Sequence, residues 1–298
     1  MEKTTTAAMQ RRSFGSKPDV PAHFQLNAST PRRLDGGNFV KIAVLAKQVP
    51  DTWSDRKLDL VTGYLDRSAS DAVPDEINER ATEVALQYKD THPETEIVAL
   101  GMGPVGADQT LRKLLSMGAD SAVLVTDPAL SGSDLVQTAL VLHAALERIG
   151  ADLVLAGNVS TDGKSGVVPA MIAELRGQAL IPGADSLAIT DTGITGTIQT
   201  DAATLTLAAA LPAVASVTEK IAEPRFPNFK NIMAAKKKPF QTWSLDDLGI
   251  QAGPESATVR SVMVSAQEKP AKQAGPQIID DGTAASQVAA FLAANRLI

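Results

Sequence analysis

Short apolar runs alternate with amphipathic stretches over residues 40–177, and this alternation constrains the fold more than any other feature of the chain. The apolar runs suited to buried strands are residues 40–47, 96–100, 122–125 and 153–156. Stretches with helical spacing follow at residues 76–89, 107–117, 133–149 and 165–175. Buried strands that alternate with helices are typical of successive βα units, so the sequence predicts an α/β fold with a mostly parallel, doubly wound sheet.

The predicted helices have suitable residues at their ends. Ser133, followed by Asp134, is a reasonable N-cap for the third helix. Glycines that can adopt the left-handed conformation stand directly after three helices, at Gly118, Gly150 and Gly177.

After Gly177 the pattern changes to alternating threonine and aliphatic residues. Such stretches lie at residues 186–190, 194–200 and 204–209, with turn residues such as Gly193 and Asp201 between them. This period of two predicts an antiparallel hairpin or meander added to the parallel sheet. Residues 213–218 predict one more buried strand.

Residues 1–39 differ in composition from the rest of the chain. They are rich in Ser, Thr, Pro and Arg and lack an apolar period, which predicts a disordered extension or a non-native segment arising from a mis-assigned start. A transit peptide is a third interpretation, although Pro18, Pro21 and Pro31 argue against one long amphipathic helix. Residues 40–250 are expected to form the α/β domain.

The last part of the chain, residues 251–298, is expected to be an arm. A Pro/Gly/Lys-rich linker at 268–276 precedes an amphipathic helix near 284–295, with Val288, Phe291 and Leu292 on one face. Because a lone helix with an apolar face folds poorly by itself, we expect the arm to wrap a partner or to pack back on the body.

Composition excludes several classes of function. The absence of cysteine rules out disulfides, thiolate metal sites and thiol nucleophiles, and fits a reducing compartment. The chain has only three histidines, which lie far apart in the sequence: His23, His92 and His143. They are unlike the clustered ligands of a metal site or the members of a catalytic triad, so no metal is expected.

Charge and hydropathy exclude two further kinds of partner. Residues 1–39 carry six Lys/Arg and three Asp/Glu, a net +3, so the total of −6 leaves −9 for the remainder, which argues against a nucleic-acid partner. No apolar run approaches the roughly 20 residues that cross a bilayer. A cytoplasmic protein is expected, or one of the mitochondrial matrix if residues 1–39 are a transit peptide.

The loop after the fourth predicted strand, residues 157–169, is the strongest candidate for binding chemistry. In an open parallel sheet, ligands bind where loops leave the carboxyl ends of the strands. This loop is small and polar and precedes a helix, so its N–H groups could hold a phosphate, with Ser165 and Lys164 assisting. It resembles a Walker loop only loosely, and an ordinary polar turn is the alternative.

A G-x-G-x-x-G sequence at residues 101–106 offers a competing hypothesis. It follows a strand, and Asp127 lies about 20 residues further on, as in a dinucleotide-binding fold. The corresponding function is a Rossmann-type NAD(P)-dependent oxidoreductase. The motif lies on the second βα unit, however, and Pro104 lacks an N–H, so a glycine-rich turn or the wall of an adenine-nucleotide site are equally open interpretations. The long connection at residues 50–75 is expected to cover a ligand or to face a partner.

The chain resembles β subunits of electron transfer flavoproteins over about residues 40–298. The resemblance is most specific at 223–238, where Glu-Pro-Arg and an aromatic residue lead to Asn-Ile-Met and a triple lysine. Further similar segments are KIAVLAKQVP at 41–50, LLSMGA at 114–119 and the Asp-Gly pair at 162–163.

The resemblance implies an adenine-nucleotide α-hydrolase-like fold, an FAD shared with an α subunit, and one AMP, which a second FAD replaces in electron-bifurcating relatives. It implies an electron carrier with no catalytic residue. Lys164 and Val167 depart from the family, where Asp and Gln are common. The residues implied for cofactor binding are Leu45, Asp75, Glu76, Ile77, Asn78, Met102, Asn158, Thr161, Asp162, Gly163, Lys164, Ser165, Gly166, Val167 and Val168.

The resemblance also implies partners. They are the α subunit, contacted by residues 251–298, acyl-CoA and other dehydrogenases as electron donors in fatty acid oxidation, and a membrane quinone oxidoreductase as acceptor. Phe229 is expected to be the apolar anchor for dehydrogenases, since a central aromatic residue is a common hot spot. The residues implied for docking are Glu223, Pro224, Arg225, Phe226, Phe229 and Asn231.

Overall fold

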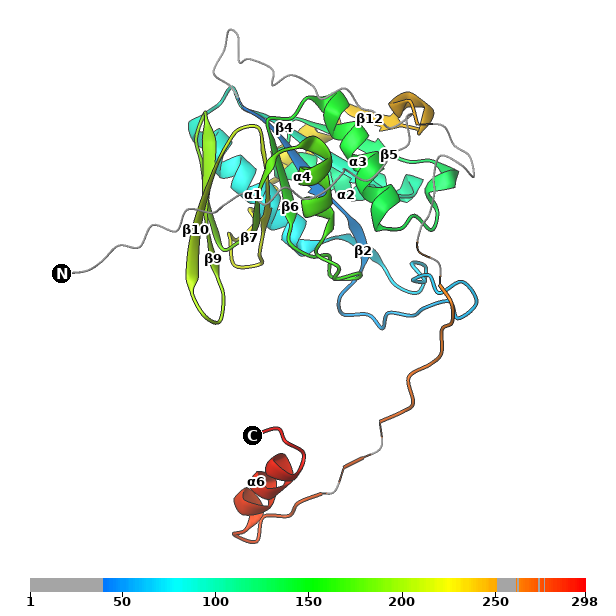
Figure 1. Cartoon of the computed structure of the whole chain (residues 1–298). Coiled ribbons are helices and arrows are strands. Elements are labelled where there is room, and N and C mark those ends of the chain that lie inside the picture. The colour runs from blue at the N-terminus through cyan, green and yellow to red at the C-terminus, as the bar shows by residue number, and fades with distance from the viewer. Residues whose placement is uncertain (1–39, 251–260, 262, 273, 276) are drawn as a thin grey trace, which may run out of the picture. The chain divides into compact units, whose positions relative to one another are not determined.

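The computed structural model describes residues 40–250, 261, 263–272, 274–275 and 277–298 (Figure 1). The predictions for residues 1–39, and part of those for 251–276, therefore lie outside the described residues. The described chain forms two compact units, a large one up to residue 262 and a small one made of residues 57–66 and the part after 262.

The large unit is built on a parallel sheet with the strand order β12-β5-β4-β1-β6-β11-β7. Its strands are β1 (Lys41–Ala46), β4 (Glu96–Met102), β5 (Ser121–Val125), β6 (Leu153–Gly157), β7 (Ala179–Ala184), β11 (Ala213–Val217) and β12 (Phe240–Trp243). The chain runs outward from β1 through β4 to β5 and then returns to place β6 on the other side of β1. The strand order thus reverses between β1 and β6, which confirms the doubly wound α/β fold.

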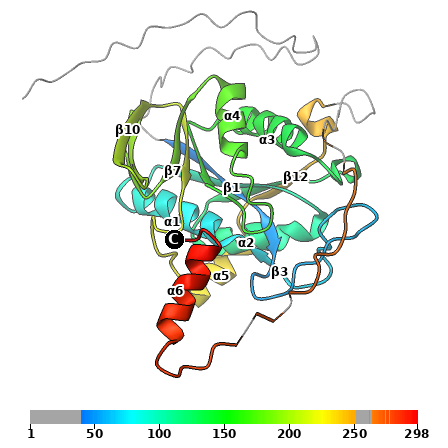
Figure 2. The same cartoon turned by 60° about the horizontal axis from the view of Figure 1, so that its bottom comes forward.

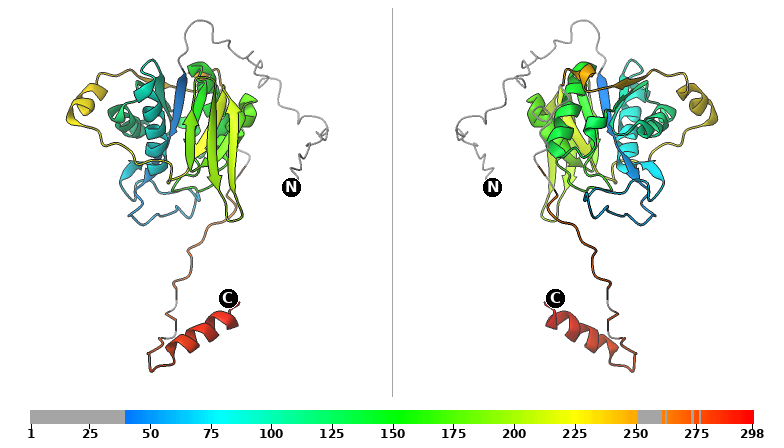
Figure 3. Two further views of the ribbon diagram at one scale, coloured as in Figure 1. Left: turned by 90° about the vertical axis from the view of Figure 1, so that its left-hand side faces the viewer. Right: turned by 90° about the vertical axis from the view of Figure 1, so that its right-hand side faces the viewer.

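Helices cover both faces of this sheet (Figure 3). The helices are α1 (Glu76–Thr91), α2 (Asp108–Met117), α3 (Leu135–Ile149) and α4 (Val168–Arg176). Along β1, Ile42 and Val44 join the hydrophobic cluster that contains α1 and α2, whereas Ala43 and Leu45 join the cluster that contains α3 and α4. Because both faces of the strand are buried, its sequence is a continuous apolar run, which is why it could be predicted.

The four strands predicted first are confirmed, but β7 and β12 were not predicted. β7 contains Pro182 and Gly183 and is only partly buried, so it lacks a strand-like apolar run. β12 has two exposed residues among its four and directly follows a lysine-rich segment. Each lies at an edge of the sheet, where the hydrophobic signal is weakest.

Three predicted helix starts are wrong by one to three residues. The N-cap of α3 is Asp134, whose Oδ1 accepts from the N–H of Gln137 at 2.9 Å, whereas the Ser133 hydroxyl donates to the carbonyl of Leu130. α4 begins at Val168 rather than at residue 165, because Gly166 has φ +67°, which no helical residue adopts. A short 3₁₀ turn, η2 (Val105–Ala107), precedes α2, which therefore begins one residue later than predicted.

The predicted antiparallel strands form a separate three-stranded sheet of β8 (Ser186–Ile189), β9 (Gly193–Gln199) and β10 (Thr204–Ala210). Gly193 permits their register, since a Cβ there would lie 2.7 Å from the carbonyl oxygen of Ala209. The remaining elements of the large unit are β2 (Gln48–Pro50), β3 (Ala72–Pro74), η3 (Pro128–Leu130), α5 (Phe229–Ala235) and η4 (Asp246–Leu248).

The small unit contains a β-bridge between Leu58 and Leu65 and the predicted terminal helix, α6 (Ala284–Ala294). Val288 and Phe291 of α6 are exposed. Among the described residues, every helix is too short or too polar to cross a bilayer.

The triple lysine after α5 does not consist only of solvated charges. The ammonium group of Lys238 donates to the carbonyls of Leu115 (3.0 Å) and Ala119 (2.6 Å) at the C-terminus of α2. Burial lowers the pKa of Lys238. Lys238 therefore joins the segment after α5 to the end of α2 by satisfying carbonyls that the helix leaves free.

Replacing Lys238 by Met should lower the free energy of unfolding by about 1–3 kcal/mol, because two carbonyls lose their charged donor. The matched control is Lys237→Met, at the exposed neighbouring lysine, which should change it by less than about 0.5 kcal/mol. Urea unfolding of both variants measures the difference. Equal effects would contradict the capping role.

Candidate functional site

The candidate site lies at the carboxyl ends of β1 and β6, where the strand order reverses. Figure 2 turns this end of the sheet toward the viewer. Lys47 follows β1, and the loop of residues 158–167, here called the β6 loop, follows β6 and leads into α4. Crevices at such reversal points are the usual ligand sites of open α/β sheets.

A buried carboxylate attaches the β6 loop to α1. Asp75 is fully buried and is the N-cap of α1, with Oδ1 accepting from the N–H of Ile77 at 3.1 Å. Its Oδ2 accepts from both the N–H (2.7 Å) and the hydroxyl (3.0 Å) of Thr161. Asp75 thus lies at the site as predicted from the resemblance, but its carboxylate is used by the protein itself.

Close packing holds the first turn of α1 against the end of β6. A Cβ on Gly157 would lie 2.9 Å from Nδ2 of Asn78 and 3.0 Å from Cγ2 of Ile77, so only glycine fits there. Oδ1 of Asn78 accepts from the N–H of Lys47 at 2.8 Å. Ile77 and Asn78 are buried beside the site, whereas Glu76 is exposed.

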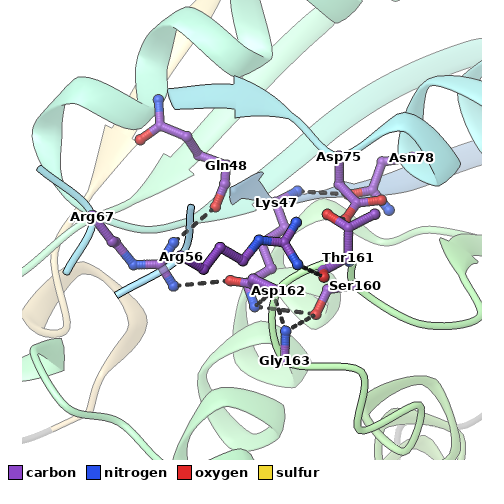
Figure 4. Close-up of polar contacts among 10 residues, drawn as sticks. All are labelled: Lys47, Gln48, Arg56, Arg67, Asp75, Asn78, Ser160, Thr161, Asp162 and Gly163. Atoms are coloured by element: carbon purple, nitrogen blue, oxygen red, sulfur yellow. Dashed lines mark hydrogen bonds and ion pairs between the residues drawn. The ribbon is translucent and has the colours of Figure 1, made fainter. Parts of the chain in front are cut away.

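Three cationic side chains converge on the β6 loop (Figure 4). Lys47 Nζ lies 2.7 Å from Oδ1 of Asp162 and donates to the hydroxyl of Ser160 at 3.3 Å. Arg67 Nη2 lies 3.2 Å from Oδ2 of Asp162, and Arg56 donates to the carbonyl of Thr161. Lys47, Arg56 and Arg67 face one carboxylate in this loop, so a positive charge excess remains at the site.

The carboxylate of Asp162 stays ionised among these groups. Its side chain is only 2% exposed, and burial alone would raise its pKa. The hydrogen bond and charge of Lys47, with the Ser160 hydroxyl and the N–H of Gly163, outweigh burial and lower the pKa to about 2.

The backbone N–H groups of the β6 loop are only partly used within the protein. In the first half, the N–H groups of Thr161, Gly163 and Lys164 donate to other parts of the loop or to Asp75. In the second half, within the described part of the chain, no partner accepts from the N–H groups of Ser165, Gly166 and Val167. Ser160 and Asp162 in the first half also have an N–H without an acceptor among the described residues, but three consecutive free N–H groups occur only at 165–167.

The second half also has the geometry of an anion site. Lys164 (φ +52°) and Gly166 (φ +67°) turn the backbone just before α4, which starts at Val168 without a side-chain cap. Free N–H groups at a helix N-terminus carry partial positive charge and bind phosphate or carboxylate groups. Asn158 lies at the start of the loop, where its N–H donates to the carbonyl of Val217.

Leu45 and Met102 lie at the same end of the sheet. Leu45 is buried in β1, and the half-buried Met102 ends β4, with Ala46 paired to Gly101 between them. Both side chains pack against the α3–α4 cluster. They place apolar surface next to the strand-order reversal, as the resemblance implied for an adenine ring.

The G-x-G-x-x-G turn has structural functions instead. Gly103 donates its N–H to Val125, and a Cβ on Gly101 would lie 3.2 Å from the carbonyl of Ala46. Both carboxylate oxygens of Asp127 are engaged, with the N–H groups of Ala129 (2.9 Å) and Leu245 (3.4 Å). The turn also follows β4, which is not at the reversal, so nothing in its geometry supports dinucleotide binding.

Exposed apolar side chains lie at α5 and just before it. Phe226 and Phe229 are 94% and 79% exposed, and Ile232 and Met233 of α5 are also exposed. Together these four side chains form what we call the docking surface. Phe229 is the first residue of α5, and Asn228 caps the helix by accepting from the N–H of Asn231 at 2.8 Å. Exposed aromatic clusters of this kind are typical of protein interaction sites.

Some residues of both surfaces were not predicted. Lys47, Arg56, Arg67 and Ser160 lie at the β6 loop, and the only sequence signal for the arginines was the length of the connection at 50–75. Within the described residues, no group of three or more His, Cys, Asp or Glu could hold a metal ion.

Comparison with known proteins gives a consistent result. Residues 62–248 match the family model described as Electron transfer flavoprotein domain. The chain is 47% identical over 266 residues to the electron transfer flavoprotein subunit beta of Mycobacterium tuberculosis (strain ATCC 25618 / H37Rv), covering 87% of this chain and 100% of the relative. It is 31% identical over 256 residues to the caffeyl-CoA reductase-Etf complex subunit CarD of Acetobacterium woodii, covering 85% and 96%.

Asp162 should make the free energy of unfolding depend on pH. Since its pKa of about 2 in the folded protein lies below the 3.8 of an aspartate in the unfolded chain, its contribution of about 2 kcal/mol is present above pH 4 and is lost as the pH falls toward 2. The difference in unfolding free energy between the native protein and Asp162→Asn should shrink by that amount over this range, measured by urea unfolding. A difference that stays constant for Asp162→Asn over this range would contradict the charge assignment.

Proposed function

This chain belongs to the electron transfer flavoprotein family as a β subunit, and on that premise we propose that it completes a flavin pocket with an α subunit and carries electrons. The observation that supports this most strongly is the 47% identity over the full length of known β subunits. The bound FAD would accept and release the electrons. No side chain of this subunit is assigned a catalytic role.

We propose that the β6 loop holds the phosphate of AMP, or of a second FAD in its place. A phosphate dianion is favoured by the free N–H groups at residues 165–167 and by the N-terminus of α4. It is also favoured by the nearby cations Lys47, Arg56 and Arg67. The apolar wall of Leu45 and Met102 would contact the adenine ring.

The docking surface is proposed to receive dehydrogenases, with Phe229 as anchor. The Acetobacterium woodii relative is named as a subunit of a caffeyl-CoA reductase-Etf complex, which supports partners that act on CoA esters. A membrane quinone oxidoreductase is the proposed acceptor. The exposed apolar face of α6 supports a contact of residues 251–298 with the α subunit. We place the protein in the cytoplasm, or in the mitochondrial matrix if residues 1–39 are a transit peptide.

Ligand analysis tests the nucleotide proposal. The heterodimer, produced with its α subunit, should be yellow and should release one FAD and one AMP per dimer on denaturation, measured by mass spectrometry. Two FAD and no AMP would place a second flavin at the β6 loop. A colourless complex without any adenine compound would contradict the proposal.

A pair of glycine variants locates the nucleotide. Gly166 and Gly177 both have positive φ (+67° and +61°), but only Gly166 lies in the β6 loop. Both changes to Ala should cost about 1 kcal/mol of stability through backbone strain. Only Gly166→Ala should also lower the AMP content of the purified heterodimer, severalfold. Equal AMP contents would refute the placement.

Phe229→Ala should leave the flavin content unchanged and slow reduction by an acyl-CoA dehydrogenase at least about tenfold, since loss of an aromatic anchor costs about 2 kcal/mol or more. Stopped-flow measurement at limiting dehydrogenase gives the rate. Leu175→Ala, at an exposed position on α4, is the control and should reduce normally. An unchanged rate for Phe229→Ala would rule out the anchor.

A further inference from the structure

We propose that Arg225 is a positioning residue, which fixes the docking surface to α1 and does not itself contact the partner. The inference rests on the proposed docking function. From the sequence, Arg225 was assigned to partner docking because it belongs to the Glu-Pro-Arg segment. The structure directs its guanidinium toward the protein's own helix.

The guanidinium of Arg225 bridges two carboxylates of α1. Its Nε and Nη2 donate to Oε2 (2.8 Å) and Oε1 (3.0 Å) of Glu83 in a bidentate pair. Its Nη1 and Nη2 donate to Oδ1 (3.2 Å) and Oδ2 (2.8 Å) of Asp90. Residues seven positions apart lie on one face of a helix, so a single planar guanidinium can pair with both. Four of its five N–H groups are used in this way.

Burial makes this arrangement hard to undo. The side chain of Glu83 is 6% exposed, and besides Arg225 only Gln87 donates to it among the described residues, at 3.2 Å. A buried carboxylate that loses its cation leaves an uncompensated charge, which is strongly destabilising. The hydrogen bonds that Arg225 donates to Glu83 and then to Asp90 raise its pKa, so the guanidinium stays charged. Turning Arg225 outward to a partner would therefore expose Glu83 to that cost.

Backbone contacts fix the same segment to α1. The N–H of Arg225 donates to Oε2 of Glu83 at 3.0 Å. Arg80, also on α1, donates to the carbonyl of Ala222 at 2.6 Å and pairs with Glu223 at 3.1 Å. Residues 222–225 are thus attached on both sides of Pro224, and the very next residue is the 94% exposed Phe226.

These attachments determine where the docking surface begins. Pro227 lies between Arg225 and the start of α5 at Phe229, and its ring fixes one backbone dihedral of this short segment. A preorganised surface binds more tightly because less conformational entropy is lost on association. Arg225 would strengthen partner binding indirectly, by keeping this segment ordered before the partner arrives.

The test uses the flavin-loaded heterodimer with Arg225→Gln, Arg225→Lys and Asp90→Asn. Arg225→Gln should increase deuterium uptake of peptides covering residues 222–235 and weaken dehydrogenase binding at least about tenfold, while the reduction rate at saturating dehydrogenase stays unchanged. Arg225→Lys should rescue neither effect, because an ammonium group cannot bridge two carboxylates with the same geometry. Arg112→Gln, in a surface pair with Asp108 on α2, is the matched control.

Asp90→Asn separates positioning from direct contact. If Arg225 acts by positioning, this variant should shift both deuterium uptake and affinity in the same direction as Arg225→Gln, and the double variant should be less than additive. Weaker binding in Arg225→Gln with unchanged deuterium uptake would overturn the proposal in favour of a direct contact. The deuterium-uptake measurement is made without a dehydrogenase. It can therefore show whether Arg225 orders residues 222–235 even if Phe229→Ala shows that the docking surface is misassigned.

Discussion

The buried carboxylate of Asp75 is the interaction on which the carboxyl end of the sheet depends. A carboxyl group with no access to solvent needs hydrogen-bond donors, and here they come from the start of α1 and from Thr161. The β6 loop can therefore lie in only one place relative to α1. Gly157 adds a steric condition, since a Cβ there would press against the side chains of Ile77 and Asn78. The hydrogen bonds of Asp75 and the close packing at Gly157 together determine where the free N–H groups of residues 165–167 lie.

Much of this fold could be predicted from the sequence because its central strands are buried on both faces. The runs that became β1, β4, β5 and β6 are apolar throughout, and the alternation with helices indicates parallel pairing. The edge strands β7 and β12 escaped prediction because exposure and Pro182 weaken their pattern. The start of α4 was misplaced because the sequence of the β6 loop does not reveal that Gly166 takes a left-handed conformation.

The candidate site could be predicted less completely, because side-chain pairing between distant segments leaves no local pattern. The β6 loop was found from its position after a buried strand. Arg67 reaches it from 95 residues away in the chain, and Arg225 reaches Glu83 from 142 residues away. The role of Lys238 could not be predicted for the same reason. A lysine that caps a distant helix cannot be distinguished by sequence from a lysine in solvent.

Helix α1 serves two surfaces at once. Its N-terminus carries Asp75 and Asn78 beside the β6 loop, and one of its faces carries the carboxylates that hold Arg225. A change that unwinds the middle of α1 would consequently disturb the β6 loop and the docking surface together. Such a double phenotype would not mean that the two ligands share a binding area, and genetic data on this subunit need to be interpreted with that mechanical link in view.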